Sequence, residues 1–265
     1  MMAFENIRLE LIEGVARLTL ARPSALNALN RPMLRELLQA LEVIGDEPAA
    51  RVLLLRGEGR AFSSGADLAS GSSAAGSPGF DAGAVLEEYY NPLIERMLNL
   101  PLPIVAGVQG PVVGAGCMIA LTADIVVAAR SAYFLQAFIQ TGLVPDCGSM
   151  WLLPRLVGRA RAVAMMMLGE RIPAGTARDW GLIYEVVDDD GALEARLTDI
   201  AGRLASGPTR AYTLIRGGVR RALEISLSDA LRIEREAQRE AGNTADFAEG
   251  LAAFRQKRPP RFTGQ

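Results

Sequence analysis

The sequence offers few groups that could transfer a proton. It contains no histidine, which excludes Ser-His-Asp and Cys-His catalysis and any metal site with histidine ligands. Its two cysteines, Cys117 and Cys147, are too few for a cysteine zinc site. Any acid or base must therefore be Asp, Glu, Lys, Tyr or Cys.

Asp146 is the carboxylate with the most unusual surroundings. Its neighbours in the sequence are apolar: Leu143, Val144, Pro145, Cys147 and Trp151. Such surroundings disfavour the charged form and would make the carboxylate a stronger base. Asp is also an ordinary helix N-cap, and Asp146 could instead cap a helix that begins near Ser149. The residues alone leave both readings open.

A second kind of chemistry needs only backbone. Residues 103–124 contain an apolar run typical of a strand (104–108), a glycine-rich turn (110–116) and then small and apolar residues typical of a helix. The first N–H groups of a helix lack partners and, with the helix dipole, suit an anion or a developing oxyanion. The alternative is a tight turn that serves only packing.

Another run of small residues, 61–68, contains Ser63 and Ser64. Both hydroxyls are poor candidates for a nucleophile, because no base of the usual type accompanies them. Residues 69–83 are rich in Gly and Ser and are expected to be mobile, either as a lid or as a plain surface loop.

The elements that would position these groups alternate between strand and helix. Residues 6–20 predict two strands around Gly14, and 51–56 and 125–129 predict short buried strands. Asn30 predicts an N-cap for a helix over 33–44, and 81–100 has helical spacing. This alternation predicts an α/β core. From residue 193 the sequence predicts helix to the end, with breaks at 207–208 and 217–218.

Composition narrows the class of protein. The 265 residues are 50% hydrophobic and 22% charged, with a net charge of −2, so no general attraction to nucleic acid is expected. The N-terminus lacks a signal-peptide pattern, and no apolar run approaches a membrane span. We therefore expect a cytoplasmic protein with reduced cysteines. The glycine turn lacks the third glycine of a dinucleotide fingerprint, and no Walker A motif occurs.

Five segments in this order together resemble the crotonase (enoyl-CoA hydratase/isomerase) superfamily, and they cover nearly the whole chain. They are Arg22-Pro23 with residues 27–30, then 61–68, 110–124, 159–181 and the tail 254–257. The resemblance implies a spiral of ββα turns over residues 1–205 and a helical region over 206–265. It further implies packing of that region in homotrimers or hexamers, an acyl-CoA thioester as substrate, no metal and no cofactor beyond the substrate's own coenzyme A.

The resemblance also assigns residues. Two backbone N–H groups would form the oxyanion hole, and by motif position these belong to Ala66 and Ala115. Such donors stabilise the enolate that forms when the thioester's α-carbon loses a proton, and one donor is typically worth about 3–4 kcal/mol. Arg22 and Lys257 would bind the CoA phosphates. The remaining predicted substrate-binding residues are Ala25, Leu26, Ala28, Ser64, Asp67, Leu68, Tyr89, Phe138 and Leu143.

The chain departs from the hydratase pattern at two positions. Hydratases carry two glutamates that hold and activate water, and the matching positions here are Met118 and Phe138. Neither side chain can transfer a proton. The turn that carries Asp146 resembles instead the phenylacetate-pathway isomerases, which act on ring-epoxidised phenylacetyl-CoA, and relatives of these shift double bonds of acyl-CoAs. A single carboxylate suits an isomerase, because it takes a proton from one carbon and returns it to another.

Three alternatives have different sequence requirements. A weak hydratase would work without the glutamates. A thioester dehalogenase would use Asp146 as nucleophile but needs a histidine base, which this chain lacks. A non-catalytic member of the fold would bind a CoA thioester or RNA, and the acidic charge balance argues against RNA.

Overall fold

The core is built on a six-stranded sheet. The computed structural model describes residues 4–68, 77 and 80–265. The strand order is β1 (Ile7–Ile12), β2 (Val15–Leu20), β3 (Val52–Gly57), β4 (Ile104–Val108), β6 (Ile125–Ala129) and β9 (Glu185–Val187). β1 and β2 pair antiparallel through the predicted turn at Gly14, and the other neighbours are parallel.

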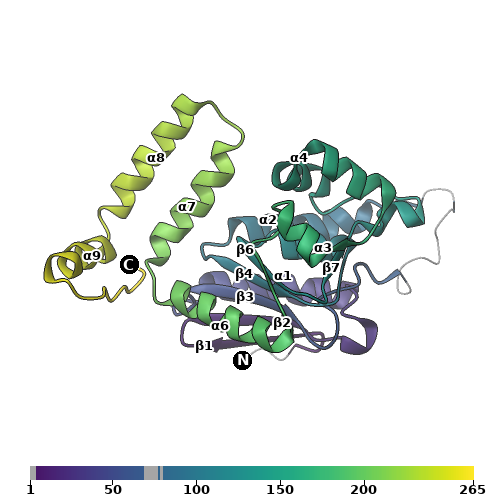
Figure 1. The fold of residues 1–265 in the computed structure, drawn as a ribbon, viewed down its shortest axis with the longest axis horizontal. Coiled ribbons are helices and arrows are strands. Elements are labelled where there is room, and N and C mark those ends of the chain that lie inside the picture. The colour runs from purple at the N-terminus through teal and green to yellow at the C-terminus, as the bar shows by residue number, and fades with distance from the viewer. Residues whose placement is uncertain (1–3, 69–76, 78–79) are drawn as a thin grey trace.

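The central strands β3 and β4 are buried on both faces of this sheet, and their successive side chains point alternately to the two faces. On β3, Leu53 and Leu55 face the larger core, whereas Val52 and Leu54 face a smaller one. The helix α6 (Asp190–Ala205) covers the smaller core with Leu193, Leu197 and Ile200. The helices α1 (Arg31–Asp46), α2 (Asn91–Asn99) and α3 (Gly114–Leu121) cover the other face (Figure 1).

The chain winds as a spiral because each turn adds one strand to each of two sheets. β5 (Pro111–Val113), β7 (Tyr133–Leu135) and β8 (Ile172–Pro173) form the second sheet. Thus β4 is followed by β5 and α3, and β6 is followed by β7. After β3, Ser63 forms a parallel bridge to Val112 of β5, which extends the same arrangement by one turn. The predicted spiral of ββα turns is confirmed.

The chain after β7 is mostly helical. A 3-10 turn (Ala137–Thr141) leads to α4 (Ser149–Leu168), and α5 (Ala174–Asp179) follows β8. After α6, α7 (Thr209–Ala222) and α8 (Leu227–Ala241) form an antiparallel hairpin that extends away from the core, with α9 (Ala245–Gln256) at its base (Figure 1).

Several sequence predictions need correction. The expected break at Gly217-Gly218 is wrong, because α7 runs through both residues and the chain turns only after Ala222. Two glycines lower helix propensity by about 1 kcal/mol each, which packing against α8 outweighs. The last nine residues are not helical. The predicted glycine turn also contains the short strand β5. Residues 69–83 lie mostly outside the described part, so their expected mobility stays a prediction.

Candidate active site

Ala66 and Ala115 come together because two glycine-containing segments touch. A Cβ placed at Gly65 would lie 2.9 Å from the carbonyl oxygen of Val113 and 3.8 Å from Cα of Gly114. Only a residue without a side chain allows this approach. Ala66 follows one of these glycines and Ala115 follows the other. The predicted pair of alanines is therefore carried on two backbones in direct contact.

Within the part of the chain that the structure describes, both amides are left available. Leu29 donates to the carbonyl of Gly65 (2.8 Å) and accepts from the amide of Asp67 (3.0 Å). Because a trans peptide points its C=O and N–H in opposite directions, the N–H of Ala66 faces away from Leu29. Ala115 is the second residue of α3, where an N–H has no acceptor within the helix, and the helix dipole adds to its positive charge. Two such donors suit an oxyanion.

Asp146 lies in the turn before α4, and its carboxyl is half-buried near the Cys147 thiol and the Tyr90 phenol. Burial raises the pKa of this carboxyl above its ordinary value. Its Oδ1 atom is buried and has no hydrogen-bond partner among the described residues. The alternative that Asp146 caps α4 is wrong, because its backbone carbonyl, not its side chain, accepts from the amide (2.9 Å) and hydroxyl (2.6 Å) of Ser149. The side chain does not cap the helix; it accepts a hydrogen bond from the thiol of Cys147, and its Oδ1 atom is left without a partner among the described residues.

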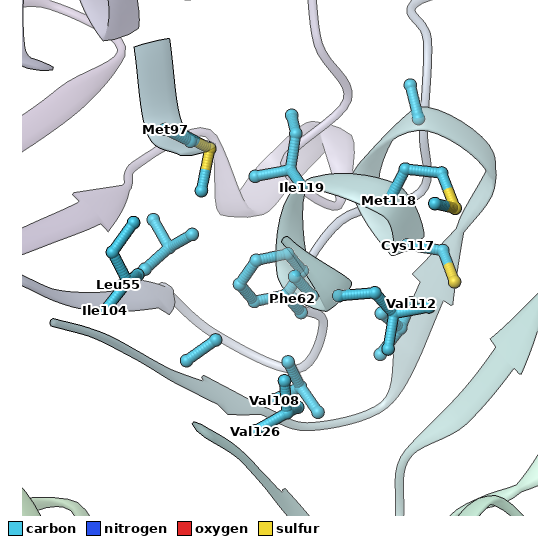
Figure 2. Packing of buried hydrophobic residues seen from close by; sticks show 14 of the residues in the cluster. Leu55, Phe62, Met97, Ile104, Val108, Val112, Cys117, Met118, Ile119 and Val126 are labelled. Carbon is cyan, nitrogen blue, oxygen red and sulfur yellow. The ribbon is translucent and has the colours of Figure 1, made fainter. Parts of the chain in front are cut away.

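The positions where hydratases carry glutamates are apolar here. Met118 is fully buried, and Figure 2 shows its sulfur and that of Cys117 on the same side of α3. The amide nitrogen Nε2 of Gln136 donates to both sulfurs, at 3.4 Å to Cys117 and 3.5 Å to Met118. The ring of Phe138 lies next to the start of α3, where a Cβ at Gly114 would be 3.8 Å from its Cζ atom. None of these groups can activate water.

The predicted binding residues from the first two motifs form one network. Arg22 donates through Nη1 to Asp67 (3.1 Å) and to the carbonyl of Ala28 (2.5 Å). Ser64 donates from its amide to the carbonyl of Leu26 (2.9 Å) and from its hydroxyl to that of Ala25 (3.4 Å). The structure thus joins residues 22–28 to residues 64–67.

Other predicted residues lie nearby or elsewhere. Leu143 donates its amide to the carbonyl of Phe138 (3.1 Å) and is exposed, as is Leu68. Tyr89 is turned toward α1, where its hydroxyl accepts from Arg35 (3.3 Å). Lys257 ends α9, which Figure 1 shows at the opposite side of the molecule from α3 and α4. Within one chain, Lys257 is therefore not part of this site.

Tyr90, which the sequence offered with Tyr89 only as a candidate for an apolar acyl pocket, lies close to Asp146. It is buried, and burial followed by the nearby Cys147, Asp146 and Asp67 raises the pKa of its phenol. Ile94, one turn further along α2, packs near Gly148, which explains why this face of the helix meets the Asp146 turn. Tyr90 ends a π-helical turn (Leu86–Tyr90), a feature that often marks functional sites. The two adjacent tyrosines could not be distinguished from helical spacing, because a π turn changes which residue faces inward.

The described residues include neither a metal-ligand cluster nor a membrane-spanning helix. They contain no group of three or more His, Cys, Asp or Glu side chains that could hold a metal ion. Nor do they include a helix with the length and apolar character needed to cross a membrane.

Comparison with known proteins places the chain among relatives along its full length. The model of the enoyl-CoA hydratase/isomerase family matches residues 10–265. The 1,2-epoxyphenylacetyl-CoA isomerase of Escherichia coli (strain K12) is 44% identical over 253 residues, which are 96% of each chain. A Rhodobacter capsulatus protein named a probable enoyl-CoA hydratase is also 44% identical and covers 100% of each chain. A solved structure of an enoyl-CoA hydratase/isomerase from Mycobacterium abscessus superposes with a TM-score of 0.93 at 40% identity, covering 98% of this chain and 100% of the other.

Proposed function

This chain belongs to the enoyl-CoA hydratase/isomerase family of enzymes, and on that premise we propose that it is an acyl-CoA isomerase with Asp146 as its proton-transfer group. One observation carries the proposal. Met118 and Phe138 stand where hydratases carry glutamates, whereas Asp146 supplies a half-buried carboxyl whose pKa is raised by burial.

The reaction follows from these positions. The carboxylate of Asp146 removes a proton from the α-carbon of a 3-enoyl thioester. The electron pair moves into the thioester, and its oxygen accepts hydrogen bonds from the amides of Ala66 and Ala115. Asp146 then returns the proton to the γ-carbon, which leaves the double bond next to the carbonyl. No water and no other reactant is consumed. The same carboxylate and amide donors suit the rearrangement of a ring epoxide of an arylacetyl-CoA, and the 44% identity to an epoxyphenylacetyl-CoA isomerase supports that substrate class.

Coenzyme A enters as part of the substrate. We propose that the segments around Ala25, Leu26 and Ala28 receive it, because they lie beside the Ala66 amide. Arg22 is already paired with Asp67 in this structure, so a phosphate would have to share or replace that carboxylate. A contact from Lys257 would come from a second copy of the chain, in keeping with a homotrimer or hexamer. We place this enzyme in the cytoplasm.

The experiment compares wild type with Asp146→Asn on 3-enoyl-CoA thioesters and on ring-epoxidised phenylacetyl-CoA. Products are identified by ultraviolet absorbance and mass. We expect the variant to lose roughly 10²-fold or more in kcat, the contribution typical of a positioned acid–base group. Asp188→Asn, at an exposed surface site, is the matched control and should retain wild-type turnover. Undiminished isomerisation by Asp146→Asn would contradict the proposal.

A hydratase is the second candidate, because a relative of equal identity is named as one. It predicts a product heavier by one water from 2-enoyl-CoA. Hydration that persists in Asp146→Asn would favour this function, whereas a product of unchanged mass in wild type favours the isomerase.

A further inference from the structure

Two buried polar residues, Asn27 and Ser63, have no place in the proton-transfer chemistry, yet both are fully buried beside Ala66. We propose that they are positioning residues which set the direction of the Ala66 amide in the oxyanion hole. This inference rests on the proposed function only because the oxyanion hole is taken from that proposal.

The hydroxyl of Ser63 connects two backbone segments. It donates to the carbonyl of Asn27 (2.8 Å) and accepts from the amide of Gly65 (3.2 Å). It thereby holds one side of Gly65, while Leu29 holds the carbonyl of the same residue. With both polar groups of Gly65 fixed, the plane of the peptide that ends in the Ala66 N–H is fixed as well.

The side chain of Asn27 fixes the other end of this connection. Its Nδ2 donates to the carbonyls of Glu58 (3.0 Å) and Ala61 (2.9 Å), and its Oδ1 accepts from the amide of Arg22 (2.9 Å). Three hydrogen bonds therefore hold the residue whose carbonyl receives the Ser63 hydroxyl.

The backbone here is strained in a way that requires such support. Leu26 and Asn27 have φ values of 52° and 54°, a left-handed conformation in which leucine is uncommon. Strained conformations persist where the surroundings over-determine them, and they cluster at ligand-binding sites. The bonds of Asn27 provide that over-determination.

Because Ser63 packs against α3, its position affects where both donor amides lie. A Cβ at Gly116 would lie 2.5 Å from both Cβ and Oγ of Ser63, so the helix start rests directly on this side chain. Ser63 thus spaces the segment of Ala66 from the helix that carries Ala115. A displacement of about 1 Å in such a site can cost on the order of 100-fold in rate.

The test measures hydrogen bonding to the thioester carbonyl in the oxyanion hole and does not require turnover. The protein is saturated with phenylacetyl-CoA that carries ¹³C at the thioester carbonyl, and the C=O stretching frequency is recorded by difference infrared spectroscopy. Hydrogen bonds to the carbonyl should lower this frequency in wild type. We expect Ser63→Ala to lose at least half of that shift, and its kcat on an active substrate to fall about 10-fold to 100-fold while KM changes less.

Thr122→Val is the matched control. Thr122 is a buried residue whose hydroxyl also donates to a carbonyl, that of Met118 (2.8 Å), at the far end of α3. Its removal should leave the frequency unchanged. If Ser63→Ala does not fold, as judged by circular dichroism, Asn27→Gly carries the test, because glycine keeps the left-handed backbone and removes only the side-chain bonds.

Failure of this inference and failure of the proposed function give different results. A full wild-type shift in Ser63→Ala, or no shift in wild type, overturns the positioning role. If the C=O frequency is lowered in wild type and this lowering is reduced in Ser63→Ala, the positioning role is supported even when no substrate is isomerised. The absence of turnover would then count against the isomerase function alone.

Discussion

Burial raises the pKa of the Asp146 carboxyl, and this has opposite consequences for catalysis and for stability. A raised pKa makes the carboxylate a better base at neutral pH. It also means that the folded state holds the Asp146 proton more tightly than the unfolded state does. The free energy of unfolding therefore falls as pH rises from the ordinary Asp pKa through the raised one. Above both values, the charged carboxylate destabilises the folded protein.

Asp146→Asn should consequently be more stable than wild type at pH 7, because it removes a buried charge whose Oδ1 has no partner among the described residues. The difference should shrink as pH falls below the ordinary Asp pKa of about 3.9, because the wild-type carboxyl then becomes neutral in both states. Thermal unfolding of both proteins across this pH range measures it. A variant less stable than wild type at pH 7 would show that the carboxylate is well solvated after all. The variant that loses activity is thus expected to gain stability.

At the scale of elements, the start of α3 depends on contacts that only small residues permit. Gly114 begins the helix with a φ of 52°, and Gly116 rests on Ser63. The helix is buried along its whole length, so it cannot move outward without exposing its core contacts (Figure 2). Its position relative to residues 63–66 is therefore set by side-chain volume.

Gly116→Ala should separate the two donors. The added methyl would overlap Ser63, and we expect a loss of about 1–3 kcal/mol in stability and at least a 10-fold fall in kcat. Gly175→Ala provides the control, since a Cβ at that helical position meets nothing within 4 Å and alanine is the better helix former. Chemical denaturation and steady-state kinetics report the two effects. Wild-type kinetics in Gly116→Ala would mean that the helix start tolerates a shift.

Strong local signals made most elements predictable. Asn30 accepts from the amide of Met33 (2.9 Å), as the N-cap prediction required, and the strand after Pro103 has the predicted bounds. β5 was missed because three residues carry too short a pattern beside a glycine turn. The roles of Asn27 and Ser63 could not be predicted, because their partners are backbone groups that only the folded chain brings within reach.

At the scale of the whole molecule, α7 carries a stripe that the single chain leaves uncovered. Ile215 and Val219 of α7 and Leu223 directly after it recur every four residues and are each 60% exposed. Leu227 and Phe254, on α8 and α9, are exposed at 76% and 83%. Contiguous apolar surface of this kind marks interaction sites. It is consistent with the self-association that the resemblance implies, which stays a prediction.

Val219→Asp should therefore weaken association. Burying an unpaired carboxylate in an interface is strongly unfavourable, and we expect the main species to become a single chain at micromolar concentration. Gln39→Glu, which adds the same charge at an exposed position of α1, should leave the assembly intact. Sedimentation velocity distinguishes the species. A wild-type protein that is already a single chain, or an unchanged assembly of Val219→Asp, would remove α7 from the interface.

The contact between Gly65 and the Val113–Gly114 peptide also has a consequence for how the enzyme comes into being. The two donor amides lie about 50 positions apart in the sequence, so the first is synthesised well before the second exists. Until β5 docks on Ser63, the Ala66 amide has no counterpart and a nascent chain cannot bind an enolate. During refolding, recovery of the carbonyl frequency shift would thus time the docking of these two turns, separately from the formation of the sheet.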